Sequence, residues 1–81
     1  MKVATLEKLR KYIGTKIKVT YRAVRNLYEY EGIMQNFNQG NLILKEHEGK
    51  PFGHGRWGFG ERWFSPNHIV KVITEDGKEW Y

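Results

Sequence analysis

The chain has 81 residues, of which 40% are hydrophobic and 28% charged, and its formal net charge is +5. A chain of this length holds one domain at most and buries a smaller share of its surface than a typical domain, so we expect a single domain over residues 1–81. The absence of cysteine excludes disulfides, thiolate metal sites and thiol nucleophiles. The apolar runs all fall short of the roughly 20 residues that span a bilayer. We therefore expect a cytoplasmic protein that does not enter a membrane.

The positive charge is concentrated at the start of the chain. Residues 1–26 carry eight basic side chains and one carboxylate, whereas residues 27–81 carry six basic and eight acidic side chains. Such an asymmetry is typical of a surface that faces a polyanion, most commonly nucleic acid. Lysines that only keep a small domain soluble would give the same count, and this alternative stays open.

A short helix is expected near the N-terminus, over about residues 5–13. Apolar residues recur at helical spacing from Leu6 to Ile13. Thr5 is suited to cap the first turn, and Gly14 lies where a left-handed C-terminal cap is favoured. A helix of two turns is not stable alone, so its apolar stripe should pack on the rest of the fold.

The period of the pattern changes from helical to two at Lys16. Lys16, Lys18 and Arg22 alternate with apolar side chains, which predicts a half-buried strand over residues 16–23 with a basic outer face. Turn residues and apolar runs divide the rest of the chain. The further elements expected are a turn at 24–27, a strand at 28–37 bent at Gly32, a turn at 38–41, a strand at 42–47, a glycine-rich loop at 48–56, a strand at 57–64, a one-turn connector at 65–67 and a strand at 69–73.

One helix followed by five short strands is typical of a small, strongly curved barrel, because closure removes open sheet edges. We therefore expect a mainly β fold in which a short N-terminal helix precedes a five-stranded, strongly bent SH3-like or Sm-like small barrel. The barrel would cover about residues 16–73, and residues 74–81 would form a short C-terminal tail.

Two segments resemble the sequence motifs of the Sm and Sm-like (LSm) RNA-binding family. In residues 32–46, a glycine-containing strand ends in an aromatic residue and leads through a polar turn to Asn41 and alternating aliphatics; residues 64–73 are similar to the second motif. The resemblance implies an RNA-binding barrel whose copies pair edge strands into a homo-oligomeric ring. Ser65 and Pro66 stand where the family has an arginine-glycine pair. Of the family's uridine pocket, Asn41 alone is matched.

The segment that ends the glycine-rich loop also has chemistry suited to RNA. Arg56, Trp57 and Arg62 offer guanidinium and aromatic faces on which unpaired bases stack, worth roughly 1–3 kcal/mol per base. Alternate aromatic residues in a strand can instead fill the core of a barrel. One of the two sets, Trp57 with Phe59 or else Trp63 or Phe64, is therefore expected in the interior.

Catalysis and metal binding are not expected. The three histidines are spread singly, whereas zinc needs three or four convergent donors. Ser65 has neither a base nor an orienting acid near it in the sequence, and the closely spaced glutamates have no cleft to work in. We expect neither a cofactor nor a metal.

The sequence thus predicts a non-enzymatic, Sm-like protein that binds single-stranded RNA as an oligomeric scaffold or RNA chaperone in a ribonucleoprotein. One alternative is an SH3-like protein-interaction module with an aromatic groove for a peptide. Another is a subunit of a larger nucleoprotein particle, ribosome-associated or viral. The residues expected to contact RNA are Lys16, Lys18, Arg22, Arg25, Asn41, Arg56, Trp57 and Arg62. The residues expected in a peptide groove are Tyr21, Tyr28, Tyr30, Trp63 and Tyr81.

Overall fold

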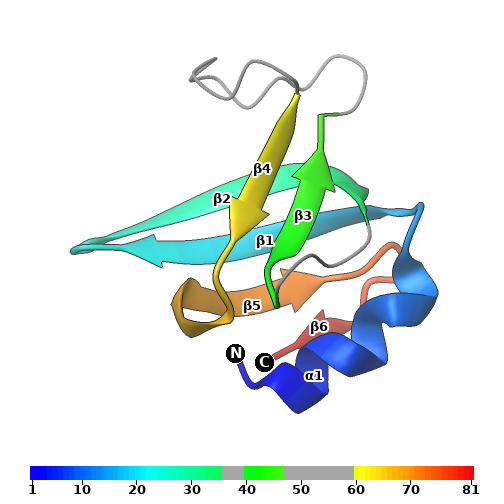
Figure 1. Cartoon of the computed structure of the whole chain (residues 1–81), viewed down its shortest axis with the longest axis horizontal. Coiled ribbons are helices and arrows are strands. Elements are labelled where there is room, and N and C mark those ends of the chain that lie inside the picture. Colours follow the sequence, from blue (N-terminus) through cyan, green and yellow to red (C-terminus); the bar gives the residue numbers. More distant parts are fainter. Residues whose placement is uncertain (36–39, 47–59) are drawn as a thin grey trace.

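The computed structural model describes residues 1–35, 40–46 and 60–81, and it is mainly β, with one short N-terminal helix and a six-stranded antiparallel sheet (Figure 1). The strands lie in the order β4-β3-β2-β1-β5-β6, and the sheet is not closed in the described residues. We expected five strands. The elements are α1 (Val3–Lys8), a 3-10 turn (Leu9–Tyr12), β1 (Lys16–Ala23), β2 (Asn26–Met34), β3 (Leu42–Lys45), β4 (Glu61–Phe64), a second 3-10 turn (Pro66–His68), β5 (Ile69–Ile73) and β6 (Glu79–Trp80).

The helix differs from the prediction at its start. It follows Lys2, and no side chain caps it. Thr5 therefore lies inside the helix, where its hydroxyl donates to the backbone oxygen of Tyr81 at 3.1 Å, and the predicted Thr5 cap was wrong. Gly14 has a φ of +91°, the left-handed conformation that we predicted. Ile13 is 39% exposed because the helix has already ended, so it does not join the buried stripe.

Strands β1 and β2 form a long hairpin that extends beyond the other strands (Figure 1). Ala23 pairs with Asn26, so the turn consists of Val24 and Arg25 alone and is shorter than predicted. Alternate residues of the hairpin point to opposite sides. We call the side on which Ile17 lies, with its side chain buried, the core face, and the opposite side the outer face.

The remaining strands extend the sheet on both sides of the hairpin. β3 pairs with β2 and β4, with Leu42 opposite Phe64. β5 returns to β1 with a register shift, and β6 pairs with β5 through Val72 and Trp80. Part of the expected C-terminal tail is therefore a strand. The ends predicted for the third and fourth strands fall partly outside the described residues.

The core lies where the sheet curves. The β3–β4 pair crosses the β1–β2 hairpin steeply (Figure 1), and the ring of Phe64 in β4 packs edge-on against Tyr21 in β1, with centroids 5.2 Å apart. Burying such apolar side chains is the main stabilising term in a domain of this size. The buried apolar residues are Leu6, Leu9, Ile17, Val19, Met34, Leu42, Ile43, Leu44, Phe64, Ile69 and Val72.

A hydrogen-bonded turn holds β6 in place. The buried hydroxyl of Thr74 donates to Asp76 Oδ1 at 2.5 Å and accepts from Trp80 Nε1 at 3.1 Å. The ring of Trp80 packs edge-on against Tyr12, with centroids 5.9 Å apart. These contacts explain why the predicted tail is ordered on the sheet. In the described part of the chain, no helix has the length and apolar composition needed to cross a bilayer.

Candidate nucleic-acid interface

Carboxylates of β2 lie on the same side of the sheet as the basic residues of β1. Glu31 lies directly opposite Lys18 in β2, and Glu29 lies diagonal to it. The ammonium of Lys18 is 3.8 Å from Glu29 Oε2, in an exposed ion pair. The basic residues of β1 do lie on its outer face as predicted, but the second strand places carboxylates on the same side. This face is therefore a poor surface for a row of phosphates.

The other basic residues predicted on this hairpin are far apart. Lys16 opens β1, whereas Arg22 is six residues further along the strand, a separation of about 20 Å. Arg25 lies in the turn, and both arginines are exposed. The predicted phosphate contacts therefore form no continuous patch. Arg22 and Arg25 instead belong to the end of the hairpin.

The core face carries a line of aromatic rings toward the free end of the hairpin. Tyr21 pairs with Tyr28 across the two strands. Ring centroids are 6.5 Å apart between Tyr28 and Tyr30, and 5.3 Å apart between Tyr30 and Phe64. Phe64 is fully buried, whereas Tyr28 is 42% exposed. We call Tyr21, Tyr28, Tyr30 and Phe64 the aromatic row.

Arg62 lies over the aromatic row. It pairs with Leu44 in β3, so it points to the core face. Its guanidinium carbon is 4.3 Å from the ring centroid of Tyr30 and 5.9 Å from that of Phe64. A cation above an aromatic face is attracted by the ring quadrupole, and a guanidinium can also stack on it. The side chain is half-buried in this position.

Two polar side chains, absent from the predicted set, extend the aromatic row at its ends. The amide nitrogen of Asn26 lies 3.4 Å from the hydroxyl of Tyr28, to which it donates. The exposed His68 ring lies beside Tyr21, with centroids 5.6 Å apart. Neither has a signal in the sequence alone. Asn26 needs the two-residue turn to reach this place, and His68 needs the 3-10 turn before β5.

The carboxylates of the described strands all lie on the side away from the aromatic row. Glu29 and Glu31 are opposite Thr20 and Lys18, which point to the outer face. Glu61 pairs with Lys45 and Glu79 with Ile73, and the strand registers put both on the outer face as well. On the described strands, the core face thus combines half-exposed tyrosines and a guanidinium with no carboxylate.

The other predicted site residues are not on this row. Asn41 precedes β3, three residues from the position opposite Arg62 and hence about 10 Å along the strand. Arg56 and Trp57 lie outside the described residues. Trp63 is 46% exposed but pairs with Ile43 on the outer face, so it does not share a groove with the tyrosines. The hydroxyl of Tyr81 donates to Glu79 instead.

The described residues contain no group of three or more histidine, aspartate or glutamate side chains arranged to hold a metal ion. Comparisons of the chain with protein-family models, with curated proteins and with solved structures find no match.

Proposed function

We propose that the chain binds single-stranded RNA, without catalysing a reaction, by stacking bases on the aromatic row. The observation that carries this proposal is the division of charge between the two sides of the sheet. The side with the tyrosines holds Arg62, and the carboxylates of the described strands lie on the other side. The exception is Glu46 just after β3, whose side chain lies on the side of the Gly60 Cβ position and hence of Arg62, so a polyanion meets less repulsion on this side than on the outer face.

The chemistry of the aromatic row fits an unpaired base. The ring of Tyr28 is 42% exposed and offers a face for stacking, worth about 1–3 kcal/mol per base. The planar guanidinium of Arg62 lies over the ring of Tyr30 and can donate to a phosphate or to a base edge. The Asn26 amide beside the Tyr28 hydroxyl is a further donor and acceptor.

We further propose that the curved sheet is an Sm-like small barrel. The return of β5 to β1 after a 3-10 turn and the contact of Phe64 with Tyr21 support this. A homo-oligomeric ring would need free edge strands, and β4 is at one end of the described sheet. At the other end β6 covers part of β5, so copies would pair β4 with β6.

A proline-rich or extended peptide is the second candidate ligand, because Tyr21, Tyr28 and Tyr30 lie together as a peptide groove requires. RNA is favoured because its phosphates can pair with Arg62 and are kept apart from the strand carboxylates on the other side of the sheet, whereas a neutral peptide gains nothing from this arrangement. The two ligands differ in salt dependence. Counterion release weakens RNA binding steeply between about 50 and 200 mM salt, whereas an apolar peptide contact persists.

The test is fluorescence anisotropy with a labelled, short, uridine-rich RNA and two tyrosine variants. We expect Tyr28→Ala to weaken binding about tenfold, as the loss of one stacked base implies. Tyr81→Ala is the matched control, because Tyr81 is 67% exposed and lies off the aromatic row. Equal loss in both variants, or no binding of RNA by the wild type, would contradict the proposal.

Light scattering of the same samples tests the ring. A closed oligomer that gains mass with RNA would support it, and a monomer of about 10 kDa that still binds RNA would restrict the proposal to the single domain. An isolated chain that binds neither RNA nor peptide would favour the third candidate, a subunit of a larger nucleoprotein particle.

A further inference from the structure

The free end of the β1–β2 hairpin has an apolar apex. Val24 is 94% exposed, and Leu27 beside it is 57% exposed. Among the described residues, Val24 is the only one other than glycine with a positive φ, at 56°. A β-branched residue rarely adopts this conformation, and two-residue hairpin turns favour glycine or asparagine there. A strained and exposed valine therefore indicates a function for its side chain.

Two arginines flank the apex, and the nearest carboxylate of β2, Glu29, lies diagonal to Arg22 on the outer face. Residues 21–28 contain Arg22 and Arg25 and no carboxylate. Both arginine side chains are exposed. Their guanidinium groups are suited to paired hydrogen bonds with phosphate oxygens. Proteins that kink duplex DNA insert apolar side chains between base steps beside arginine and lysine side chains, and an apolar tip between two arginines offers a similar combination.

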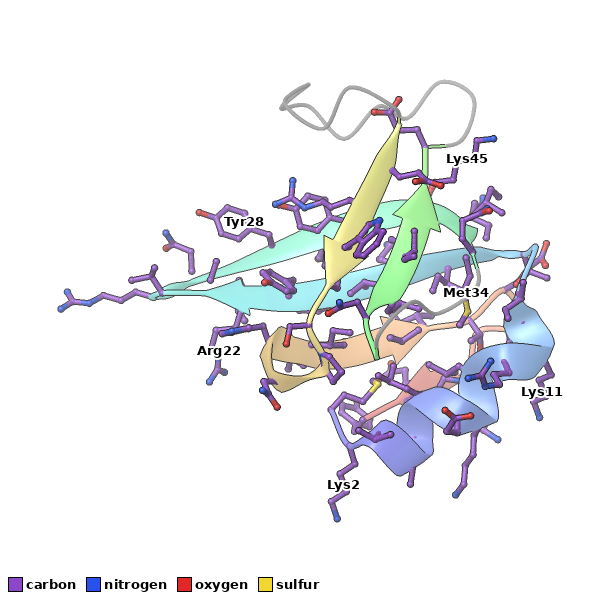
Figure 2. The ribbon with its side chains drawn as sticks, viewed as in Figure 1. Lys2, Lys11, Arg22, Tyr28, Met34 and Lys45 are labelled. Carbon is purple, nitrogen blue, oxygen red and sulfur yellow. The ribbon has the colours of Figure 1, made fainter. Side chains whose placement is uncertain are left out.

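The two sides of the hairpin end differ in chemistry. Arg22 pairs with Leu27 on the outer face, whereas Tyr28 points to the core face. Figure 2 shows Tyr28 and Arg22 on opposite sides of the hairpin. Side chains on the two faces of a ribbon leave it in opposite directions. The apex can therefore meet two nucleic-acid strands at once, one on each side.

We propose that this hairpin end is a wedge that binds where an RNA stem opens into unpaired strands. Val24 packs on the last base pair, Tyr28 receives the strand that enters the aromatic row, and Arg22 contacts a phosphate of the departing strand. This inference rests on the proposed function and names its substrate class, an RNA fork. Val24 and Tyr28 lie on the same end of one hairpin, which supports this inference because a strand that leaves the apex can pass directly to Tyr28.

An anionic membrane fits the hairpin end less well. The side chains of Val24 and Leu27 together offer less apolar surface than one myristoyl chain, which by itself gives only marginal membrane binding. A bilayer would also bury Arg22 and Tyr28 to similar depths, although they lie on different sides. The two nucleic-acid strands that diverge at a fork can instead contact Arg22 on one side and Tyr28 on the other.

The experiment compares three labelled RNAs of matched sequence: a stem with unpaired ends, a blunt stem and a single strand. The first base pair of the fork carries 2-aminopurine, whose fluorescence rises when it is unstacked. We expect the wild type to bind the fork about tenfold more tightly than the single strand and to raise this fluorescence. Val24→Gly suits a positive φ and so preserves the turn. This variant should lose both the preference for the fork and the rise in fluorescence. Its binding to the single strand should not change.

The outcomes separate this inference from the proposed function. Single-strand binding that is lost in Tyr28→Ala, together with equal fork binding by the wild type and Val24→Gly, would overturn the wedge alone. No binding to any RNA would overturn both. Cosedimentation with vesicles that contain phosphatidylserine, lost in Val24→Gly while fork binding is unchanged, would assign the hairpin end to membranes and overturn the wedge.

Discussion

The hydroxyl of Tyr12 donates to Asp76 Oδ2 at 2.9 Å and thereby joins two turns that are 64 residues apart in the sequence. Asp76 also accepts from the Thr74 hydroxyl and from the backbone nitrogen of Lys78. One carboxylate therefore fixes the turn before β6 and ties it to the end of the N-terminal helical segment. The two ends of the described sheet are stabilised differently, since β4 has no such tie to the helix in the described residues.

The pH dependence of stability should report on this carboxylate. The hydrogen bond from Thr74, followed by those from Tyr12 and Lys78, holds the pKa of Asp76 below its ordinary value. A lowered folded pKa stabilises the fold above the ordinary value of about 4, and this stabilisation is lost as the pH falls through the folded value. We expect the melting temperature of the wild type to fall more on acidification than that of Asp76→Asn. Parallel curves for the two proteins would contradict this role.

The sequence predicted a short N-terminal helix followed by a mainly β chain because the period of the apolar pattern is a local property. The switch at Lys16 from helical to alternating spacing matches the structure, as does the left-handed Gly14. The sixth strand was missed because it depends on contacts between distant residues. Residues 74–81 look like a polar tail until Thr74, Asp76 and Tyr12 are seen together.

The candidate site was predictable only in part, because strand register decides which side chains share a surface. Arg62, which was predicted to contact RNA, lies over the ring of Tyr30, and Tyr28 and Tyr30, which were predicted to share a groove, do lie on one face. The neutralisation of Lys18 was not visible, since it requires the pairing that brings Glu29 and Glu31 beside it. A run of basic residues in one strand says nothing about the strand next to it.

Phe64 should be the most sensitive core position near the site. It is fully buried and contacts the rings of Tyr21 and Tyr30. Phe64→Ala is expected to cost about 3–5 kcal/mol, a large part of the roughly 5–15 kcal/mol available to a small domain. Its half-exposed neighbour Trp63 serves as the control, and Trp63→Ala should cost less than about 1 kcal/mol. Urea unfolding measures both, and similar costs would mean that Phe64 does not organise the aromatic row.

Arg62 should contribute to RNA binding through its planar group as well as its charge. Arg62→Lys keeps the charge but cannot stack on Tyr30 in the same way, so we expect about fivefold weaker binding with an unchanged salt dependence. Arg62→Ala should weaken binding further and lower the salt dependence. Lys18→Gln is the control for loss of a positive charge, because Lys18 is already beside Glu29, and it should change the affinity less than about twofold. Equal effects of Lys18→Gln and Arg62→Lys would exclude a specific role for the guanidinium.

Two turn positions should respond to substitution with opposite signs. Val24 adopts a φ of 56°, a left-handed conformation that costs an L-residue roughly 1–2 kcal/mol, whereas glycine loses about 0.5–1 kcal/mol in chain entropy. Val24→Gly should therefore stabilise the fold by about 0.5–1 kcal/mol. Gly77 has a φ of +84°, and an alanine methyl group there would meet no atom within 4 Å beyond the adjoining residues. Gly77→Ala should therefore destabilise the fold by about 1 kcal/mol through backbone conformation alone.

The two variants serve as controls for each other in urea unfolding, because both change only a turn. If Val24→Gly raises the unfolding midpoint while it removes the preference for the RNA fork, then the wild-type chain retains a valine that lowers its own stability. Such an exchange of stability for binding is expected where a strained residue contacts a ligand. A midpoint that falls in Val24→Gly would mean that the valine stabilises the hairpin, and the strain that motivates the wedge would then be absent.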